Sequence, residues 1–350
     1  MSSITTLKPL HVELAQFRGK RIFFEPLEGN NGDKLIEMGS HTLLQSIDAK
    51  LVSNPKQADA IVVNGGAGMT DIWSHGLGTL RKYNSLYADI PLIILPSSFS
   101  FTKTNFASLF CDRKAPAFIY ARERYSLQPL ENLAFPTDVR LGLDHDMAFQ
   151  LNDTSYFKYL QTREAQKHIL IVERNDAERV TNTSHQPQKP NWKRHIPWLV
   201  KRPINRHLLW KINRRSIAKQ LGELGLQTEF AQEWHQKVLV DHPEFENLPV
   251  FAADISSPAL CSFDRFNQLI ADAAVVVSTR LHVTILAAML DKPTYIKPGS
   301  YHKIKGIYEH SLANQENVRF VRLFPVSSIV RSVRRSAYLQ MQPCNDGGIA

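Results

Sequence analysis

Short apolar runs alternate with amphipathic stretches along the first 150 residues. Four of the apolar runs predict strands, at residues 21–26, 58–64, 91–96 and 118–123. Helical spacing of the apolar positions predicts helices over residues 34–47, 77–87 and 124–133. Each predicted strand is a continuous apolar run and not a period-two alternation. This is typical of a parallel sheet covered by helices on both faces.

The same pattern restarts after a predicted hinge over residues 151–166. Strands are predicted at 168–173, 273–278 and 293–297, and helices at 216–224, 281–290 and 326–339. We therefore expect an α/β protein with two Rossmann-like domains that face each other across a cleft. The expected domains are residues 1–155 and 165–325, followed by a closing helix and tail over 326–350.

Composition narrows the class of protein. Of 350 residues, 43% are hydrophobic and 21% are charged, which excludes a disordered chain. Three widely spaced cysteines (Cys111, Cys261 and Cys344) exclude a disulfide scaffold and a cysteine-based zinc site. No apolar run is long enough to span a bilayer, and the first residues lack the pattern of a secretory signal. We expect a cytoplasmic protein with no metal and no cofactor.

The positive charge is concentrated in one insertion, residues 189–215. The chain has 42 Lys and Arg against 33 Asp and Glu, a net charge of +9, and this segment holds nine basic residues and no acidic one. It also holds three of the five tryptophans, Trp192, Trp198 and Trp210. Basic residues interleaved with Trp suit an anionic membrane surface. The alternative is that the segment is a solvated surface loop. We do not expect it to bind nucleic acid.

Polar and glycine-rich positions follow the predicted strands of the first domain. In parallel sheets, ligands bind beyond the carboxyl ends of the strands. Gly65–Gly68 does not have the spacing of a dinucleotide-binding turn, and by itself it indicates no more than a tight connection. The candidate binding residues at these strand ends are Asn31, Asp33, Gly65, Gly66, Ser97, Ser98, Arg122 and Glu123.

Two arginines follow strands of the second domain. Arg174 and Arg280 should point into one cleft, where two guanidinium groups can bind a phosphate and a carboxylate on one small molecule. His282 lies two residues after Arg280, in the first turn of a predicted helix, where it can donate a proton. The alternative is structural: Arg280 pairs with a carboxylate such as Asp272, and His282 is an interior histidine.

An ordered set of motifs across residues 29–306 resembles the polysaccharide pyruvyl transferases. Two departures are Ala67 in place of the last residue of a Gly-Gly-Gly run, and the context Glu173-Arg-Asn-Asp176 of the arginine after the second-domain strand. The matching pieces are Gly29-Asn-Asn-Gly-Asp33, Val62-Val-Asn-Gly-Gly-Ala-Gly68, Asp71-Ile-Trp73, Leu95-Pro-Ser-Ser98, Ala121-Arg-Glu-Arg-Tyr-Ser126, Asp146-Met-Ala-Phe149, Val277-Ser-Thr-Arg-Leu-His282 and Tyr301-His-Lys-Ile-Lys-Gly306.

The resemblance implies a fold similar to that of the B-type glycosyltransferases. It implies a reaction that moves a pyruvyl group from phosphoenolpyruvate onto two hydroxyls of a sugar, with release of phosphate. The C-terminal domain would then hold the donor through Arg174, Arg280, His282 and Lys305, with His282 as general acid. Asp33 or Glu123 would be the base, and the N-terminal domain would hold the acceptor through Asn31, Asp33, Gly65, Gly66, Ser97, Ser98 and Arg122.

The resemblance also gives the insertion 189–215 an expected role. Acceptors in such pathways are often carried on a lipid at the inner face of the plasma membrane, so the insertion would hold the enzyme there. The main alternative is a nucleotide-sugar-dependent glycosyltransferase of the same fold. A non-enzymatic basic adaptor is a third interpretation, but it would be expected to lack Arg174, Arg280 or His282, and all three are present.

Overall fold

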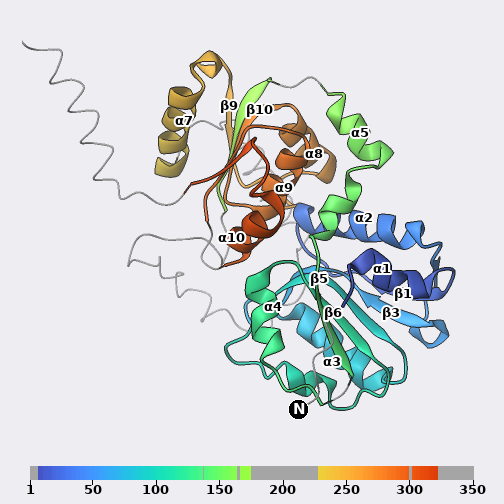
Figure 1. Ribbon diagram of the computed structural model, residues 1–350. Coiled ribbons are helices and arrows are strands. Elements are labelled where there is room, and N and C mark those ends of the chain that lie inside the picture. Colours follow the sequence, from blue (N-terminus) through green and yellow to red (C-terminus); the bar gives the residue numbers. More distant parts are fainter. Residues whose placement is uncertain (1–6, 137, 164–165, 175–227, 299–301, 322–350) are drawn as a thin grey trace, which may run out of the picture. The chain divides into compact units, whose positions relative to one another are not determined.

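Two parallel sheets form the framework of the chain (Figure 1). The computed structural model describes residues 7–136, 138–163, 166–174, 228–298 and 302–321. Within these residues the first sheet has seven strands, in the order β2-β1-β3-β5-β6-β7 with β4 beside β5, and the second has five, in the order β12-β11-β10-β8-β9. The predicted α/β class with two parallel sheets is confirmed.

The first sheet contains the four predicted strands together with β2 and β7, which were not predicted, and it differs from the prediction again at Gly65–Gly68. There a tight turn was expected, but Gly66–Thr70 is strand β4. Gly66 has φ +126, a conformation open to glycine, and it pairs with Ser97. The pairing is possible because β5 continues past the predicted end at Pro96. The strands are β1 Arg21–Glu25, β2 Lys50–Leu51, β3 Ala60–Val63, β4 Gly66–Thr70, β5 Leu92–Ser100, β6 Ala117–Ala121 and β7 Val139–Leu143.

Helices cover both faces of the first sheet. On one face, α3 (His75–Leu86) and α4 (Arg124–Glu131) pack on strand residues such as Ile61 and Ile94. On the other, α1 (Leu10–Leu14) and α2 (Asn31–Ser46) pack on the alternate positions, such as Val62 and Leu95. Successive strand residues point to opposite faces, so a strand covered on both sides must be apolar throughout. The short 3₁₀ turns of this region are η1 Ala15–Phe17, η2 Pro55–Gln57 and η3 Ala107–Phe110.

The second sheet is built in the same way. Helices α5, α8 and α9 share one apolar core with its strands, and Trp234 of α7 packs on Tyr295 with ring centroids 5.9 Å apart. The strands are β8 His168–Val172, β9 Val250–Ala252, β10 Ala273–Ser278, β11 Thr294–Ile296 and β12 Val318–Phe320. The helices are α5 Ser155–Gln161, α7 Glu229–Asp241, α8 Phe263–Ala271, α9 Leu281–Met289 and α10 Lys303–Ile307, with η4 Met147–Leu151, η7 Pro243–Phe245 and η8 Tyr308–Leu312.

The predicted hinge over 151–166 contains helix α5, whose Phe157 and Leu160 are buried in the core of the second sheet. That core also takes in Leu35 of α2 and Ala148 and Leu151 of η4. Contact density divides the chain only after Phe320, into Met1–Phe320 and Val321–Ala350. Both sheets lie in the first unit, and the expected boundary near residue 155 stays a prediction. The predicted helices at 216–224 and 326–339 and the insertion 189–215 lie outside the described residues.

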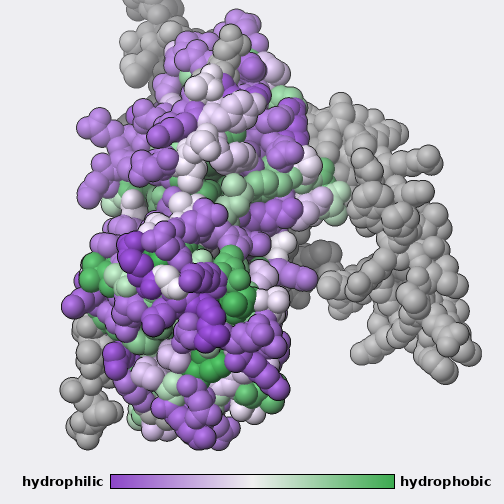
Figure 2. Space-filling model, turned by 90° about the vertical axis from the view of Figure 1, so that its right-hand side faces the viewer, coloured by the Kyte–Doolittle hydropathy of each residue, from purple (hydrophilic) through white to green (hydrophobic). Residues whose placement is uncertain are grey.

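Hydrophilic side chains predominate on the face drawn in Figure 2, with hydrophobic ones in separate patches. The large hydrophobic residues that are exposed are dispersed along the chain, among them Ile72, Leu86 and Val240. No helix in the described part of the chain is long and apolar enough to cross a membrane.

Candidate active site

A cavity of about 690 Å³ lies at the carboxyl ends of strands from both sheets. This is the position where parallel sheets bind ligands, because the loops after the strands converge there. Its lining comes from β4, from the segments after β1, β3, β4, β6, β8, β9 and β10, and from α2, α3, α9 and α10. The lining residues are Leu27, Glu28, Gly29, Asn30, Asp33, Gly65, Ala67, Gly68, Trp73, His75, Arg122, Arg174, Asp254, Ser256, Ser257, Pro258, Ala259, Leu260, Arg280, Leu281, His282 and Lys303.

Arg280 is the N-cap of α9, and a carboxylate orients its guanidinium in the cavity wall. Nε donates to Asp254 Oδ1 at 2.9 Å and Nη2 donates to Oδ2, a two-point pairing that fixes the plane of the group. Only 7% of Arg280 is exposed. The carboxylate is not Asp272, which pairs with Arg163 at 2.7 Å.

Arg174 reaches the same cavity from the neighbouring strand. β8 pairs with β10 in parallel, so the residues that follow the two strands lie side by side. The Arg174 amide donates to Thr279 Oγ1 at 2.7 Å, which ties the end of β8 to the residue before Arg280. The structure therefore brings the two predicted arginines together.

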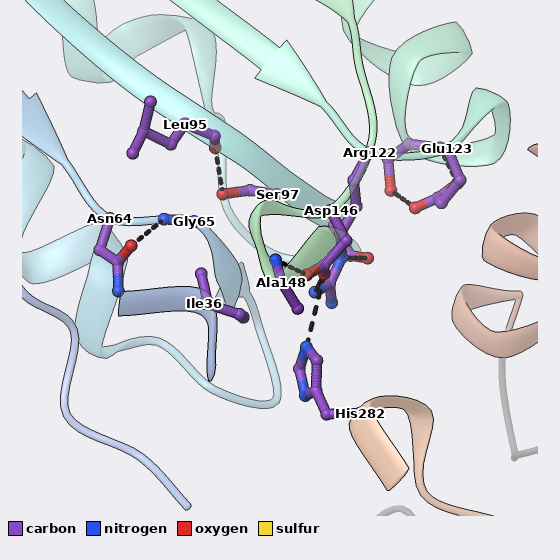
Figure 3. Close-up of polar contacts among 12 residues, drawn as sticks. Ile36, Asn64, Gly65, Leu95, Ser97, Arg122, Glu123, Asp146, Ala148 and His282 are labelled. Atoms are coloured by element: carbon purple, nitrogen blue, oxygen red, sulfur yellow. Dashed lines mark hydrogen bonds and ion pairs between the residues drawn. The ribbon is translucent and has the colours of Figure 1, made fainter. Parts of the chain in front are cut away.

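His282 lies in the first turn of α9, with one ring nitrogen directed at a buried carboxylate. Its Nε2 is 3.4 Å from Asp146 Oδ2 (Figure 3). On another side the ring fits against Gly32 of α2, where a Cβ would lie 2.4 Å from Nδ1. The imidazole is thus held between α2 and the segment after β7.

Arg122 follows β6 and is completely buried. Nη1 donates to Asp146 Oδ2 at 2.6 Å and Nε donates to Ser98 Oγ at 2.9 Å. Its Nη2 is buried without a hydrogen-bond partner among the described residues. A buried N–H group with no partner costs free energy, and it is a ready donor for a ligand that enters the cavity.

The start of α2 forms the opposite wall. Asn30 and Asp33 make a capping box, in which Asp33 Oδ2 accepts from the Asn30 amide at 2.7 Å and the Asn30 side chain accepts from Gly32. Asp33 both caps the helix and lines the cavity. The Asn31 side chain instead donates to Ile255 O at 3.2 Å and Cys261 O at 2.9 Å, which holds the segment after β9 against α2.

Comparison with known proteins identifies the family of the chain. The family model of the polysaccharide pyruvyl transferases matches residues 10–297. The chain belongs to this family. No curated protein matches it in sequence.

A solved structure shows a fold that this pyruvyl transferase family member shares. A functionally uncharacterised protein from Klebsiella pneumoniae has a TM-score of 0.57 at 18% identity, over 89% of this chain and 97% of that one. The heptosyltransferase WaaC of E. coli with ADP-2-deoxy-2-fluoro heptose has a TM-score of 0.34 at 11% identity, over 90% of this chain and 99% of that one.

Not every predicted residue of this family member lines the cavity. Gly65 does, but Gly66 pairs with β5, and Ser97 Oγ donates to Leu95 O at 2.8 Å inside the sheet. Ser98 does not line the cavity, and its Oγ accepts a hydrogen bond from Arg122 Nε. Lys305 is half exposed, and it pairs with Glu309 at 3.6 Å and covers the Tyr125 ring. Lys303, two residues earlier, is the lysine that lines the cavity.

Glu123, the second predicted base, lies away from His282 in Figure 3. It is the N-cap of α4 and accepts from the amide and the hydroxyl of Ser126. It also pairs with His302 at 3.7 Å, and burial lowers the pKa of that histidine despite the carboxylate. These contacts give Glu123 a structural position outside the cavity lining.

Several residues of the site had no role in the expectations from sequence. Asp254 follows β9, a strand of three residues too short to stand out. Trp73, Asp146 and Lys303 lie in the family motifs, so the resemblance did carry a signal for them. His75 carried none. In the described part of the chain, no three His, Cys, Asp or Glu side chains are grouped so as to hold a metal ion.

Proposed function

We propose that this chain transfers the pyruvyl group of phosphoenolpyruvate to two hydroxyls of a sugar in a cell-surface polysaccharide or its precursor, with release of phosphate. The observation that carries the proposal is the convergence of Arg174, Arg280 and His282 in one cavity, at the ends of two adjacent strands. Membership of the polysaccharide pyruvyl transferase family supports it.

The donor wall comes from the second sheet. Phosphoenolpyruvate carries a phosphate and a carboxylate, and Arg174, Arg280 and Lys303 line this wall with a single acid, Asp254. Guanidinium groups match both anions with paired hydrogen bonds. The N-terminus of α9 adds the partial positive charge of a helix end. We assign the donor to this wall.

His282 is the general acid in the proposed reaction. The methylene carbon of phosphoenolpyruvate accepts a proton, which makes its second carbon electrophilic, and a sugar hydroxyl attacks that carbon and loses its own proton. Phosphate then leaves with the electron pair of the carbon–oxygen bond, and a second hydroxyl attacks the same carbon and closes the ketal, giving its proton to the departing phosphate. Arg280 and the helix end stabilise the negative charge of the departing phosphate.

The acceptor wall comes from the first sheet, with α2. It carries Glu28, Asp33, Trp73 and His75 around the glycines that follow β3. We keep Asp33 as the proposed base, because Glu123 is occupied in the cap of α4 and does not line the cavity. Trp73 offers an aromatic face to a sugar ring, and the buried Nη2 of Arg122 offers a donor to an oxygen of either substrate.

The test is phosphate release from phosphoenolpyruvate in the presence of acceptor, beside thermal-shift titrations with phosphoenolpyruvate and with nucleotide sugars. A ligand at a hundred times its Kd stabilises the folded state by about 2.7 kcal/mol. We expect phosphoenolpyruvate to stabilise the wild-type protein. The stabilisation should be smaller in Arg280→Lys, because lysine lacks the planar fork of the guanidinium group. His282→Ala should release no phosphate. Stabilisation by a nucleotide sugar alone would favour the alternative, a glycosyltransferase.

We also propose that the acceptor is lipid-linked and that the enzyme works at the inner face of the plasma membrane. The support is compositional, since the nine basic residues and three tryptophans of 189–215 lie outside the described residues. Sedimentation with anionic vesicles tests it. Deletion of 189–215 should abolish co-sedimentation, and unchanged binding would refute the role of the insertion.

A further inference from the structure

We propose that Asp146 is a positioning residue for His282, which fixes the ring and its proton so that Nδ1 is the nitrogen that serves the substrate. The proposal rests on the role of His282 as general acid. It is carried by a buried chain of charges in which Asp146 Oδ2 contacts both His282 Nε2, at 3.4 Å, and Arg122 Nη1, at 2.6 Å (Figure 3).

Asp146 cannot turn away from the imidazole. It is completely buried, and as the N-cap of η4 its Oδ1 accepts from the Ala148 amide at 2.9 Å. The other oxygen is held by Arg122, whose Nε is itself bound to Ser98. With both oxygens fixed, the carboxylate has one orientation, and that orientation aims Oδ2 at Nε2.

The carboxylate remains charged although it is buried. Burial alone would raise the pKa of Asp146, but the positive charges of His282 and Arg122 and the hydrogen bonds outweigh burial and hold the pKa well below its ordinary value. An anion at this position stabilises the protonated imidazole. When the ring is neutral, the anion requires the remaining proton to be on Nε2.

The ring is also held from the side of α2. Gly32 lies against Nδ1 and Cβ of His282, so the imidazole cannot swing toward the helix without a clash. The charged side chains that line the cavity are Glu28, Asp33, Arg122, Arg174, Asp254, Arg280 and Lys303. Asp146 is not one of the lining residues, and its Oδ2 lies 3.4 Å from Nε2 of the ring.

In this arrangement the two ring nitrogens of His282 have different roles. Nε2 donates to Asp146, and no hydrogen-bond partner for Nδ1 lies within the described residues. In the proposed reaction the proton on Nδ1 moves to the methylene carbon of phosphoenolpyruvate. The ring becomes neutral with its remaining proton on Nε2, still bound to Asp146, and Asp146 itself never takes up a proton.

Asp146→Asn tests the inference, because the amide keeps the shape and removes the charge. We expect kcat to fall by about 10²-fold or more, with a much smaller change in the KM for phosphoenolpyruvate, and the alkaline limb of the kcat profile to move to lower pH. The matched control is Asp272→Asn, which breaks the ion pair with Arg163 outside the cavity and should leave the pH profile unchanged. An unaltered profile in Asp146→Asn overturns the inference.

A second measurement needs neither variant nor turnover. Nitrogen-15 NMR of the His282 side chain in the wild-type enzyme should give the Nε2–H tautomer for the neutral ring, and an Nδ1–H tautomer overturns the inference even where Asp146→Asn does not fold. Failure of the proposed function looks different, since the wild-type enzyme would neither bind phosphoenolpyruvate nor release phosphate from it, whatever the tautomer.

Discussion

At the residue scale, Gly32 is the position where a single methyl group would disturb the site most directly. It lies in the first turn of α2, and a Cβ there would be 2.4 Å from His282 Nδ1 and 2.6 Å from its Cβ. Atoms this close cannot coexist, so Gly32→Ala must push the imidazole out of place. We expect kcat to fall at least about tenfold while far-ultraviolet circular dichroism stays unchanged.

The matched control is Gly78→Ala, at the fourth residue of α3. Nothing lies within 4 Å of a Cβ at that position. Alanine is the better helix former by about 0.5–1 kcal/mol, so Gly78→Ala should raise Tm slightly and leave kcat unchanged. Equal kcat values in the two variants would show that the contact of Gly32 with His282 is unimportant.

The sequence predicted some of the residues that line the cavity and missed others for a physical reason. Arg280 and His282 directly follow β10, a six-residue strand that its apolar pattern makes plain. Lys303 and Lys305 lie two residues apart on a short helix, and periodicity alone does not tell which one faces a cavity built by other segments. Asp254 depends on a pairing between distant parts of the chain, which no local pattern contains.

At the element scale, β8 begins with a buried histidine that should make stability depend on pH. His168 is 4% exposed, and its Nε2 lies 2.9 Å from Leu269 O. Burial lowers the pKa of His168 in spite of this hydrogen bond, so the unfolded chain takes up a proton more readily than the folded one. The stabilisation is complete above the unfolded pKa of about 6.5 and is lost as pH falls toward the folded value.

Urea unfolding between pH 7.5 and pH 5 measures this dependence. The free energy of unfolding should decrease on acidification in the wild type and decrease less in His168→Gln, whose side chain does not titrate. His310, whose pKa burial also lowers, contributes with the same sign, so the dependence should shrink and not vanish. The control is His41→Gln, at a side chain 37% exposed. If the free energy of unfolding fell by the same amount between pH 7.5 and pH 5 in His168→Gln and in the wild type, the prediction would be contradicted.

The elements themselves divide by the continuity of their apolar pattern. Strands with a continuous apolar run were predicted, including the three-residue β11, and so were helices α2, α3, α4 and α9. The five-residue β7, in which Arg140 and Gly142 interrupt the apolar residues, was not predicted, and neither were the short strands β2, β9 and β12 or the helices α5, α7 and α8. β4 was read as a turn from its glycines, yet the β5 backbone beyond Pro96 offers it a partner. A glycine-rich segment indicates an unusual backbone conformation, but it does not exclude that the segment pairs with a neighbouring strand.

At the scale of the whole molecule, the two sheets share buried groups. Leu35 of α2 and Ala148 and Leu151 of η4 belong to the core of the second sheet. Asn31 is bonded to the segment after β9, and His282 is paired with Asp146, which follows β7. Separation of the sheets would expose this apolar surface and leave buried polar groups unpaired, and both cost free energy. We therefore expect that neither sheet unfolds by itself with a free energy much below that of global unfolding.

Native-state hydrogen exchange tests this coupling. The slowest amides of β3 and of β10 should exchange with the same free energy, equal to that of global unfolding. Phosphoenolpyruvate should raise both values equally, although its proposed contacts lie mainly on the second sheet, because a ligand of the folded state adds its binding free energy to every opening that destroys its site. An opening confined to β10 with a free energy below that of global unfolding would contradict the coupling. It would favour the expected domain boundary near residue 155.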